Sequence, residues 1–237
     1  MSDKPVLRVD WCSHEAAKFA VEHWHYSRTM PVSKRAHLGA WEGGEFIGAV
    51  IFAWGANPNL AKAYGLEMTQ CAELVRVALK PHKTPVSQIL SVCVRMLRKQ
   101  SEGLRLLVSY ADTREGHHGG IYQAAGWVYT GTTSTKFDYM LSGKLLQRRS
   151  YTGVNFGNPK MAIPAQAVKV KSPIKHRYLY PLDSAMREQI APLAKPYPKR
   201  DTCAASKAGV APGFQPGEGG STPTAALQEI TRDDGAG

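Results

Sequence analysis

The pattern of apolar residues predicts an α/β (α+β) fold in which helices flank a central mixed sheet. Apolar residues recur at helical spacing in residues 13–24 and 85–100. Strand-length apolar runs separate and follow these helices, and the run at 104–112 is apolar enough to lie buried on both faces of a sheet. The chain has 237 residues, 43% of them hydrophobic, so it is long enough for one well-buried domain.

Each predicted element has a local signal. Ser13 is placed to cap the first helix, and Pro85 and Gly103 mark the beginning and the end of the second. Two apolar runs on either side of adjacent glycines predict a hairpin over 36–54. The remaining predicted elements are, in order, a strand at 72–79, the buried strand at 104–112, a short helix running into a strand at 116–131, and a hairpin at 136–149.

Charge is unevenly distributed along the chain. The formal net charge is +11, and residues 201–237 contain five acidic and two basic residues, which leaves residues 1–200 at +14. A folded region this basic indicates an acidic partner, most commonly nucleic acid. A solvated basic surface without a partner is the alternative.

Composition divides the chain into three predicted regions. Residues 1–150 form the main domain, and residues 151–200 form a basic, Pro- and Tyr-rich C-terminal arm that packs on the domain or on the nucleic acid. Within the arm, 184–193 predicts one short helix. Residues 201–237 are rich in Gly, Ala, Pro, Ser and Thr, and therefore predict a disordered tail.

Several classes of protein are disfavoured. No run approaches the roughly 18 apolar residues of a membrane span, and the N-terminus has no apolar signal core, so we expect a cytoplasmic protein. The four cysteines are far apart and form no CxxC pair, which predicts free thiols rather than disulfides or a zinc knuckle.

Short segments of the chain resemble a known family. The strand at 72–79, the helix from Pro85, the strand at 104–112 and the segment "GIYQAAGWVYTG" are together similar to the core of the GNAT acyltransferase fold. The phrases "HWHYSRTMP", "ELVRVAL", "YADTREGHHGGIYQAAGWVYTG" and "KHRYLYPLD" closely resemble the Mom family of bacteriophage DNA-modification proteins over about residues 11–183. The resemblance implies a GNAT-like enzyme that converts adenine in double-stranded DNA to N6-carbamoylmethyl adenine, protecting phage DNA from restriction in the host cytoplasm.

Two residues are the leading catalytic candidates. Asp112 ends the buried strand 104–112, where open α/β sheets place ligands, so we expect it to orient or deprotonate the adenine amine. A helix cap is the alternative role for this aspartate. The resemblance to GNAT enzymes implies that Tyr122 acts as a general acid to the leaving group, whereas packing of its ring in the core is the structural alternative.

The segment 22–31 is expected to border the acceptor side. There Tyr26 or His25 would stack on or hydrogen bond to a flipped adenine, and Arg28 would clamp phosphates. A structural loop that closes on the sheet is the alternative. The further residues predicted to bind DNA are Lys34, Arg35, Arg76 and His118.

The loop before the second long helix is the predicted donor site. His82, Lys83, Ser87 and Gln88 are its candidate ligands. The loop has no glycine and contains two prolines, which puts in doubt the backbone grip on coenzyme A that is typical of GNAT enzymes. The carbamoylmethyl group contains a nitrogen atom, which an acetyl group lacks and a glycyl group supplies. We therefore expect an activated glycyl donor such as glycyl-tRNA, with acetyl-coenzyme A as the alternative.

Other functions remain open on the sequence alone. A non-enzymatic DNA-binding protein would explain the charge, and a GNAT N-acetyltransferase acting on a protein or small molecule would explain the order of elements. We expect no bound metal, although His23, His25, His117, His118 and Asp112 are potential ligands. Nothing in the sequence indicates an oligomeric state.

Overall fold

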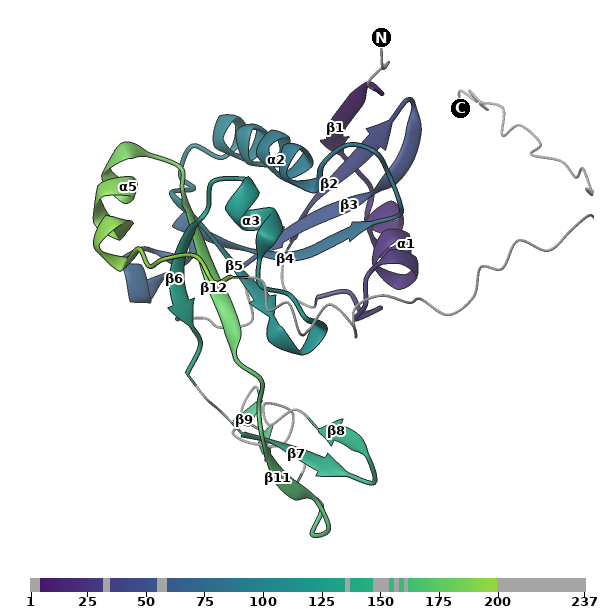
Figure 1. Cartoon of the computed structure of the whole chain (residues 1–237), viewed down its shortest axis with the longest axis vertical. Helices are drawn as coiled ribbons and strands as arrows, with labels where there is room; N and C mark the ends of the chain where they lie inside the picture. Colours follow the sequence, from purple (N-terminus) through teal and green to yellow (C-terminus); the bar gives the residue numbers. More distant parts are fainter. Residues whose placement is uncertain are drawn as a thin grey trace, which may run out of the picture.

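The computed structural model describes residues 5–31, 35–54, 59–134, 137–146, 154–155, 158–159 and 162–199. Their main feature is a seven-stranded mixed sheet with the order β1-β2-β3-β4-β5-β12-β6 (Figure 1). Its strands are β1 (Leu7–Trp11), β2 (Arg35–Glu42), β3 (Glu45–Ala53), β4 (Cys71–Leu79), β5 (Leu106–Asp112), β6 (Val128–Thr132) and β12 (Lys175–Pro181). Within this sheet β4 and β5 are the parallel pair and the other neighbours are antiparallel. The predicted α/β fold class is confirmed.

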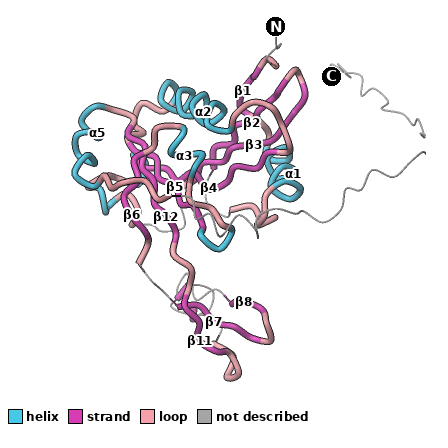
Figure 2. Tube along the Cα trace, in the orientation of Figure 1, coloured by secondary structure: helices cyan, strands magenta, loops and turns pink. Residues whose placement is uncertain are grey.

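Helices cover both faces of the sheet, as Figure 2 shows in cyan. The α-helices are α1 (His14–Trp24), α2 (Val86–Gln100), α3 (Gly120–Ala124) and α5 (Ser184–Ile190). Alternation along β3 separates the faces, because Val50 and Phe52 share a core cluster with α2 whereas Ala49 and Ile51 share one with α1. Short 3-10 helices complete the fold: η1 (Lys62–Tyr64), η2 (Met68–Gln70), η3 (Thr113–Glu115) and η4 (Ala191–Leu193).

The strand β12 lies inside the sheet, between β5 and the edge strand β6, although it comes from the region predicted to be an arm. It pairs with β5 on one side and with β6 on the other, and Tyr178 and Leu179 are fully buried there. The predicted short helix follows as α5. The boundary predicted at residue 150 is thereby corrected, because it separates β12 from the sheet to which it belongs. Residues 200–237, which include the predicted tail, lie outside the described residues.

The two parallel strands run together for only part of their length. Their register extends over four residue pairs, from Cys71–Leu106 to Leu74–Ser109. Beyond these pairs β4 continues beside β3, and β5 continues beside β12. A register shift in the β3–β4 pairing next to Leu74 is typical of a β-bulge, which bends a strand. The carboxyl ends of β4 and β5 therefore separate, at the position where open α/β sheets bind ligands.

A second, three-stranded sheet projects from the main body (Figure 1). This projecting sheet has the order β11-β7-β8 and consists of β7 (Phe137–Leu141), β8 (Lys144–Leu146) and β11 (Val168–Lys171). The strands β7 and β8 form the predicted hairpin around Ser142 and Gly143, whose φ values of 48° and 76° suit a tight two-residue turn. A two-stranded ladder of β9 (Val154–Asn155) and β10 (Asn158–Pro159) lies between β8 and β11 in sequence.

Gly119, immediately before α3, occupies a position that no other residue fits. Its φ is +86°, and a Cβ added there would lie 2.3 Å from the Tyr178 ring. Tyr178 is fully buried and its hydroxyl donates to the His118 carbonyl at 2.5 Å, so the ring has little room to move. We expect Gly119→Ala to lower the free energy of unfolding by roughly 2–5 kcal/mol, because left-handed strain and overpacking add. Urea unfolding measures this loss.

Gly126→Ala is the matched control for this substitution. Gly126 also has a positive φ, +75°, but no atom of the described residues lies within 4 Å of a Cβ placed there. Only the backbone strain remains, so the expected loss is about 1–2 kcal/mol. Equal losses in the two variants would contradict the steric explanation for Gly119.

Candidate active site

Two hydroxyl groups lie at the point where β4 and β5 separate. Ser109 is the last β5 residue paired with β4, and its Oγ donates to the Leu74 carbonyl at 3.0 Å. The Ser109 side chain also affects the pKa of Tyr122, so the two hydroxyl groups lie near each other. Both side chains are buried, where a polar group needs a partner, and Ser109 has that partner in the Leu74 carbonyl.

Aromatic packing on α3 fixes the position of Tyr122. The Tyr122 ring centroid lies 5.3 Å from that of Trp127 and 5.2 Å from that of Tyr178. Burial raises the pKa of Tyr122 to about 12, although the nearby Ser109 side chain lowers it. The hydroxyl is therefore protonated at neutral pH and can donate a proton. The ring packs in the core, as the structural alternative required. The role of the hydroxyl as a general acid stays a prediction.

The loop after α1 brings two aromatic side chains of segment 22–31 close to this point. The Tyr26 side chain is exposed, and its ring centroid lies 4.2 Å from that of His25 and 5.8 Å from that of His117. Partial burial and then the nearby Asp112 carboxylate raise the pKa of Tyr26. Tyr26 in turn raises the pKa of Tyr122. Side chains from the α1 loop, the end of β5 and α3 therefore lie within electrostatic range of one another.

His25 is kept neutral by its surroundings. Its ring is 8% exposed, and Nδ1 accepts a hydrogen bond from the Ser27 backbone N–H at 3.1 Å. Burial, followed by the positive charges of Arg76 and His117, lowers the pKa of His25 to about 4. Because Nδ1 is an acceptor, the neutral ring carries its proton on Nε2, which leaves one N–H donor.

Arg76 on β4 holds the same loop in place. Its Nε and Nη2 atoms donate to the Thr29 carbonyl at 3.2 and 3.1 Å, and Nη1 donates to the Val75 carbonyl at 2.7 Å. Burial lowers the pKa of the Arg76 guanidinium. Arg76, which we predicted to bind DNA, therefore donates its hydrogen bonds to backbone carbonyls of the protein itself.

The other predicted DNA contacts are placed differently. Arg28 is exposed and has a positive φ of 47°, which is uncommon for a residue with a side chain. His118 is half-buried, and its carbonyl accepts from Tyr178. Lys34 lies outside the described residues, and so does the side chain of Arg35. Of this group, Arg28 is the exposed cation closest in sequence to Tyr26.

Asp112 has two partners at the end of β5. Its Oδ1 atom accepts from the Arg114 backbone N–H at 3.0 Å and thereby caps η3. Its Oδ2 atom lies 2.8 Å from Nζ of Lys175 on β12. The structural alternative, a helix cap, is therefore present, and the carboxylate also lies near enough to Tyr26 to raise its pKa. A catalytic role of Asp112 stays a prediction. Sequence reasoning missed Lys175 because it assigned that residue to the arm.

A carboxylate of the protein itself occupies the predicted donor loop. Glu42 at the end of β2 accepts from the backbone N–H groups of Lys83 at 3.0 Å and Thr84 at 2.7 Å, and from the Thr84 hydroxyl at 2.6 Å. The hydrogen bond from the Thr84 side chain is the main cause that lowers the pKa of Glu42 to about 2. Sequence reasoning missed Glu42, because no local pattern connects it to a loop so distant in the chain.

The four predicted donor ligands lie along this loop and the first turn of α2. The Nδ1 atom of His82 donates to the Lys80 carbonyl at 2.7 Å. Lys83 and Gln88 are exposed, whereas Ser87 is half-buried. Their side chains are available to a donor, but two backbone amides of the loop already have an acceptor.

Metal binding finds no support in the described part of the chain. No group of three or more His, Cys, Asp or Glu side chains there could hold a metal ion. His23 points elsewhere than His25, because its Nδ1 atom donates to the Phe19 carbonyl at 2.8 Å and its ring stacks on Phe19.

Among the described residues, no helix has the length and apolar character that a membrane span requires.

The fold and the site define a mixed α/β protein whose polar centre lies where two parallel strands separate. Comparison with known proteins adds the family. The chain belongs to the Mom protein family, whose profile matches residues 6–199. It is similar to methylcarbamoylase Mom of Escherichia phage Mu, with 25% identity over 204 residues, 81% of this chain and 84% of that protein.

Solved structures of acetyltransferases are similar at a lower level. An N-acetyltransferase from Staphylococcus aureus Mu50 has a TM-score of 0.44 and 11% identity over 75% of this chain and 98% of that chain. A Bacillus subtilis acetyltransferase in complex with CoA has a TM-score of 0.44 and 14% identity over 75% of this chain and 99% of that chain. At these TM-scores the similarity supports no statement about activity.

The low pKa of His25 makes stability depend on pH. Below about pH 6.5 the unfolded chain binds a proton at this residue, whereas the folded protein does not until about pH 4. The stabilisation present above pH 6.5 is therefore lost as the pH falls towards 4. For a ring this buried we expect a loss of roughly 3 kcal/mol. His25→Asn keeps an acceptor for Ser27 and should remove this part of the pH dependence in urea unfolding.

His23→Asn is the control for the loss of an imidazole. His23 is exposed on the same stretch of chain, and its variant should retain the pH dependence that His25 causes. If the stability of His25→Asn fell with pH as steeply as that of the unaltered protein, the assignment of the low pKa to His25 would be wrong.

Proposed function

We propose that this protein converts adenine in double-stranded DNA to N6-carbamoylmethyl adenine by acyl-type transfer to the exocyclic amine. Membership of the Mom family supports this reaction, and the name of the phage Mu relative, a methylcarbamoylase, matches the group transferred. The observation that carries the proposal is the proximity of Tyr26, Asp112 and Tyr122 at the separation of β4 and β5. Three groups able to bind, orient and protonate reacting atoms come from three separate elements.

Product chemistry favours an activated glycyl donor such as glycyl-tRNA. The adenine amine attacks the glycyl carbonyl, a C–N bond forms, the ester C–O bond breaks, and the proton of the amine passes to the departing hydroxyl. The free glycyl amine then attacks ring carbon C6, with the advantage of a tethered nucleophile. Cleavage of the original C6–N bond leaves the glycinamide, so every atom of the product is supplied.

Each site residue has a role in this reaction. Adenine must leave the duplex stack to expose its amine, and Tyr26 with the neutral His25 would hold the flipped base. Asp112 would orient the amine or accept its proton. Tyr122 would protonate the leaving group.

The raised pKa of Tyr122 supports its role as proton donor to the leaving group. A ribose alkoxide is strongly basic and needs a proton as it departs, whereas a thiolate is a weaker base and needs less help. A phenol whose pKa is raised to about 12 is therefore suited to an ester donor.

The donor loop points in the same direction. Glu42 already accepts from the amides of Lys83 and Thr84. A pyrophosphate on those amides would have to displace this carboxylate and would be repelled by it. We therefore favour an ester donor bound through side chains such as those of His82 and Lys83, with acetyl-coenzyme A as the alternative.

Nucleoside mass spectrometry tests the function and the donor together. Purified protein is incubated with duplex DNA and either charged glycyl-tRNA or acetyl-coenzyme A, and the DNA is then digested. We expect deoxyadenosine to gain the mass of a carbamoylmethyl group with glycyl-tRNA. If deoxyadenosine gained the mass of an acetyl group with acetyl-coenzyme A instead, acetyl-coenzyme A would be the donor. If adenine stayed unmodified with both donors and with a cell extract, the proposed function would be contradicted.

Substitution of Asp112 separates its chemical role from its structural ones. Asp112→Asn should keep the cap on η3, because Asn caps about as well as Asp, but it removes the basic carboxylate. Loss of a general base typically reduces the rate by a factor of roughly 10² to 10⁴. We expect that loss in the rate of adenine modification, with thermal unfolding close to that of the unaltered protein.

Lys175→Met is the matched control, because it breaks the ion pair and leaves the carboxylate in place. It should retain far more activity than Asp112→Asn. Equal activities in the two variants would assign Asp112 to the ion pair and remove it from the chemistry.

A further inference from the structure

One face of the projecting sheet gathers lysine and aromatic side chains. The pairing of β11 with β7 sets Lys169 opposite Tyr139 and Lys171 opposite Phe137. Directly opposite residues of an antiparallel pair share a face, as do alternate residues of one strand. The pairing of β8 with β7 adds Lys144 to the same side. We call these five residues the basic face.

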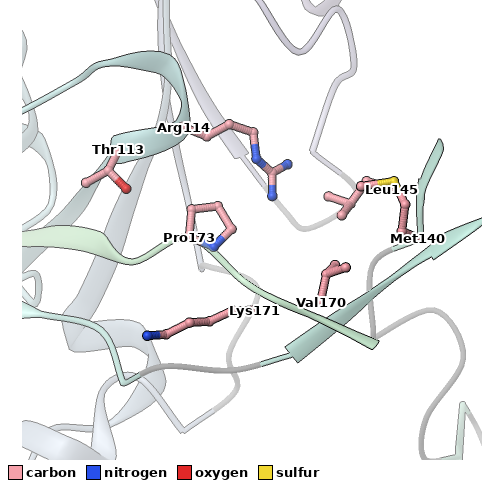
Figure 3. Close-up of a pocket in the computed structure, with 7 residues that line it drawn as sticks. All are labelled: Thr113, Arg114, Met140, Leu145, Val170, Lys171 and Pro173. Carbon is pink, nitrogen blue, oxygen red and sulfur yellow. The ribbon is translucent and has the colours of Figure 1, made fainter. Parts of the chain in front are cut away.

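The opposite face of this sheet is apolar and turned towards the main body. Met140, Leu145 and Val170 line an open cavity of about 490 Å³, and Arg114 of η3 lines its other side. Lys171 also lines this cavity, although Figure 3 shows its side chain extending in a different direction from these three. The other four residues of the basic face do not line it.

The side chains of the basic face are accessible and positively charged. Lys144, Lys169 and Lys171 are exposed, and no acidic residue occurs on this face among the described residues. The acidic residue of β7, Asp138, lies on the opposite face, where its carboxylate accepts from the Ser172 hydroxyl at 2.7 Å.

Aromatic rings accompany these lysines. Lys169 Nζ lies 4.3 Å from the centroid of the Phe137 ring, and that ring is 44% exposed. Cations interleaved with aromatic rings are typical of surfaces that bind nucleic acid.

The projecting sheet is fastened beside the candidate active site. The Thr113 hydroxyl donates to the Ile174 carbonyl at 2.7 Å, in the segment that joins β11 to β12. The next residue, Lys175, forms the ion pair with Asp112. The segment that joins the projecting sheet to β12 therefore lies next to Asp112.

We infer that the projecting sheet is an arm that binds the phosphates of duplex DNA through its basic face. This inference rests on the proposed function and adds the surface that holds the substrate. Lysine side chains contact phosphates without regard to base sequence. The arm grips the duplex while the loop of Tyr26 handles the base, so binding and chemistry use separate residues.

Salt-dependent DNA binding by the full chain tests this arm. Fluorescence anisotropy with a labelled duplex gives the slope of log affinity against log salt concentration. In Lys169→Ala/Lys171→Ala, binding should weaken and the slope should become shallower by about two units, since each neutralised phosphate contributes about 0.9. Arg98→Ala/Lys99→Ala removes the same charge from the exposed last turn of α2 and should keep the original slope.

The outcomes separate the arm from the proposed function. If the Lys169→Ala/Lys171→Ala variant kept the slope and affinity of the unaltered protein, the inference that the projecting sheet binds DNA would be wrong. The proposed function would stand. Equal losses in the two variants would overturn the arm in favour of a general effect of charge. A loss with transfer RNA but not with duplex DNA would also overturn it. Absence of duplex binding by the unaltered protein would instead count against the proposed function itself.

Discussion

The separation of β4 from β5 is the constraint on which the site depends. Two parallel strands that part after four residue pairs leave backbone groups without a strand partner, and buried backbone groups need one. Ser109 supplies it, since its hydroxyl donates to the carbonyl of Leu74, the last paired residue of β4. Tyr122 lies near enough for Ser109 to affect the pKa of its hydroxyl. The polar centre therefore results from satisfying the backbone at the place where the sheet divides.

Polar contacts between distant segments hold the surroundings of this centre. Arg76 joins β4 to the loop after α1, Glu42 joins the end of β2 to the loop before α2, and Asp112 joins β5 to β12. Each contact places a charged group against a fixed partner, which sets its electrostatic environment. The cationic Arg76 beside a buried ring is one reason why the pKa of His25 is low, and a neutral imidazole is suited to contact a neutral base.

Local patterns predicted the parts of the fold whose signals are local. The apolar periodicity of 85–100 predicted α2, and the apolar run ending in Asp112 predicted β5. The strand β12 escaped prediction because Lys175, His176 and Arg177 read as a solvated arm. In the structure, partners on neighbouring strands satisfy these side chains, including Asp112 for Lys175, Tyr129 for His176 and Thr130 for Arg177. The role of Glu42 was not predicted either, because it depends on a contact with Lys83 and Thr84 that only the tertiary fold creates.

The place of β12 ties the site to the order in which the chain is synthesised. It is the last strand of the sheet in sequence, and in the strand order it is the neighbour of both β5 and β6. While residues 175–181 have not left the ribosome, β6 has no neighbour in the sheet and Asp112 has no Lys175. Pairing between such distant segments is a slow step of folding. An incompletely synthesised chain therefore lacks an assembled site, and the protein acquires it as one of the last events of its folding.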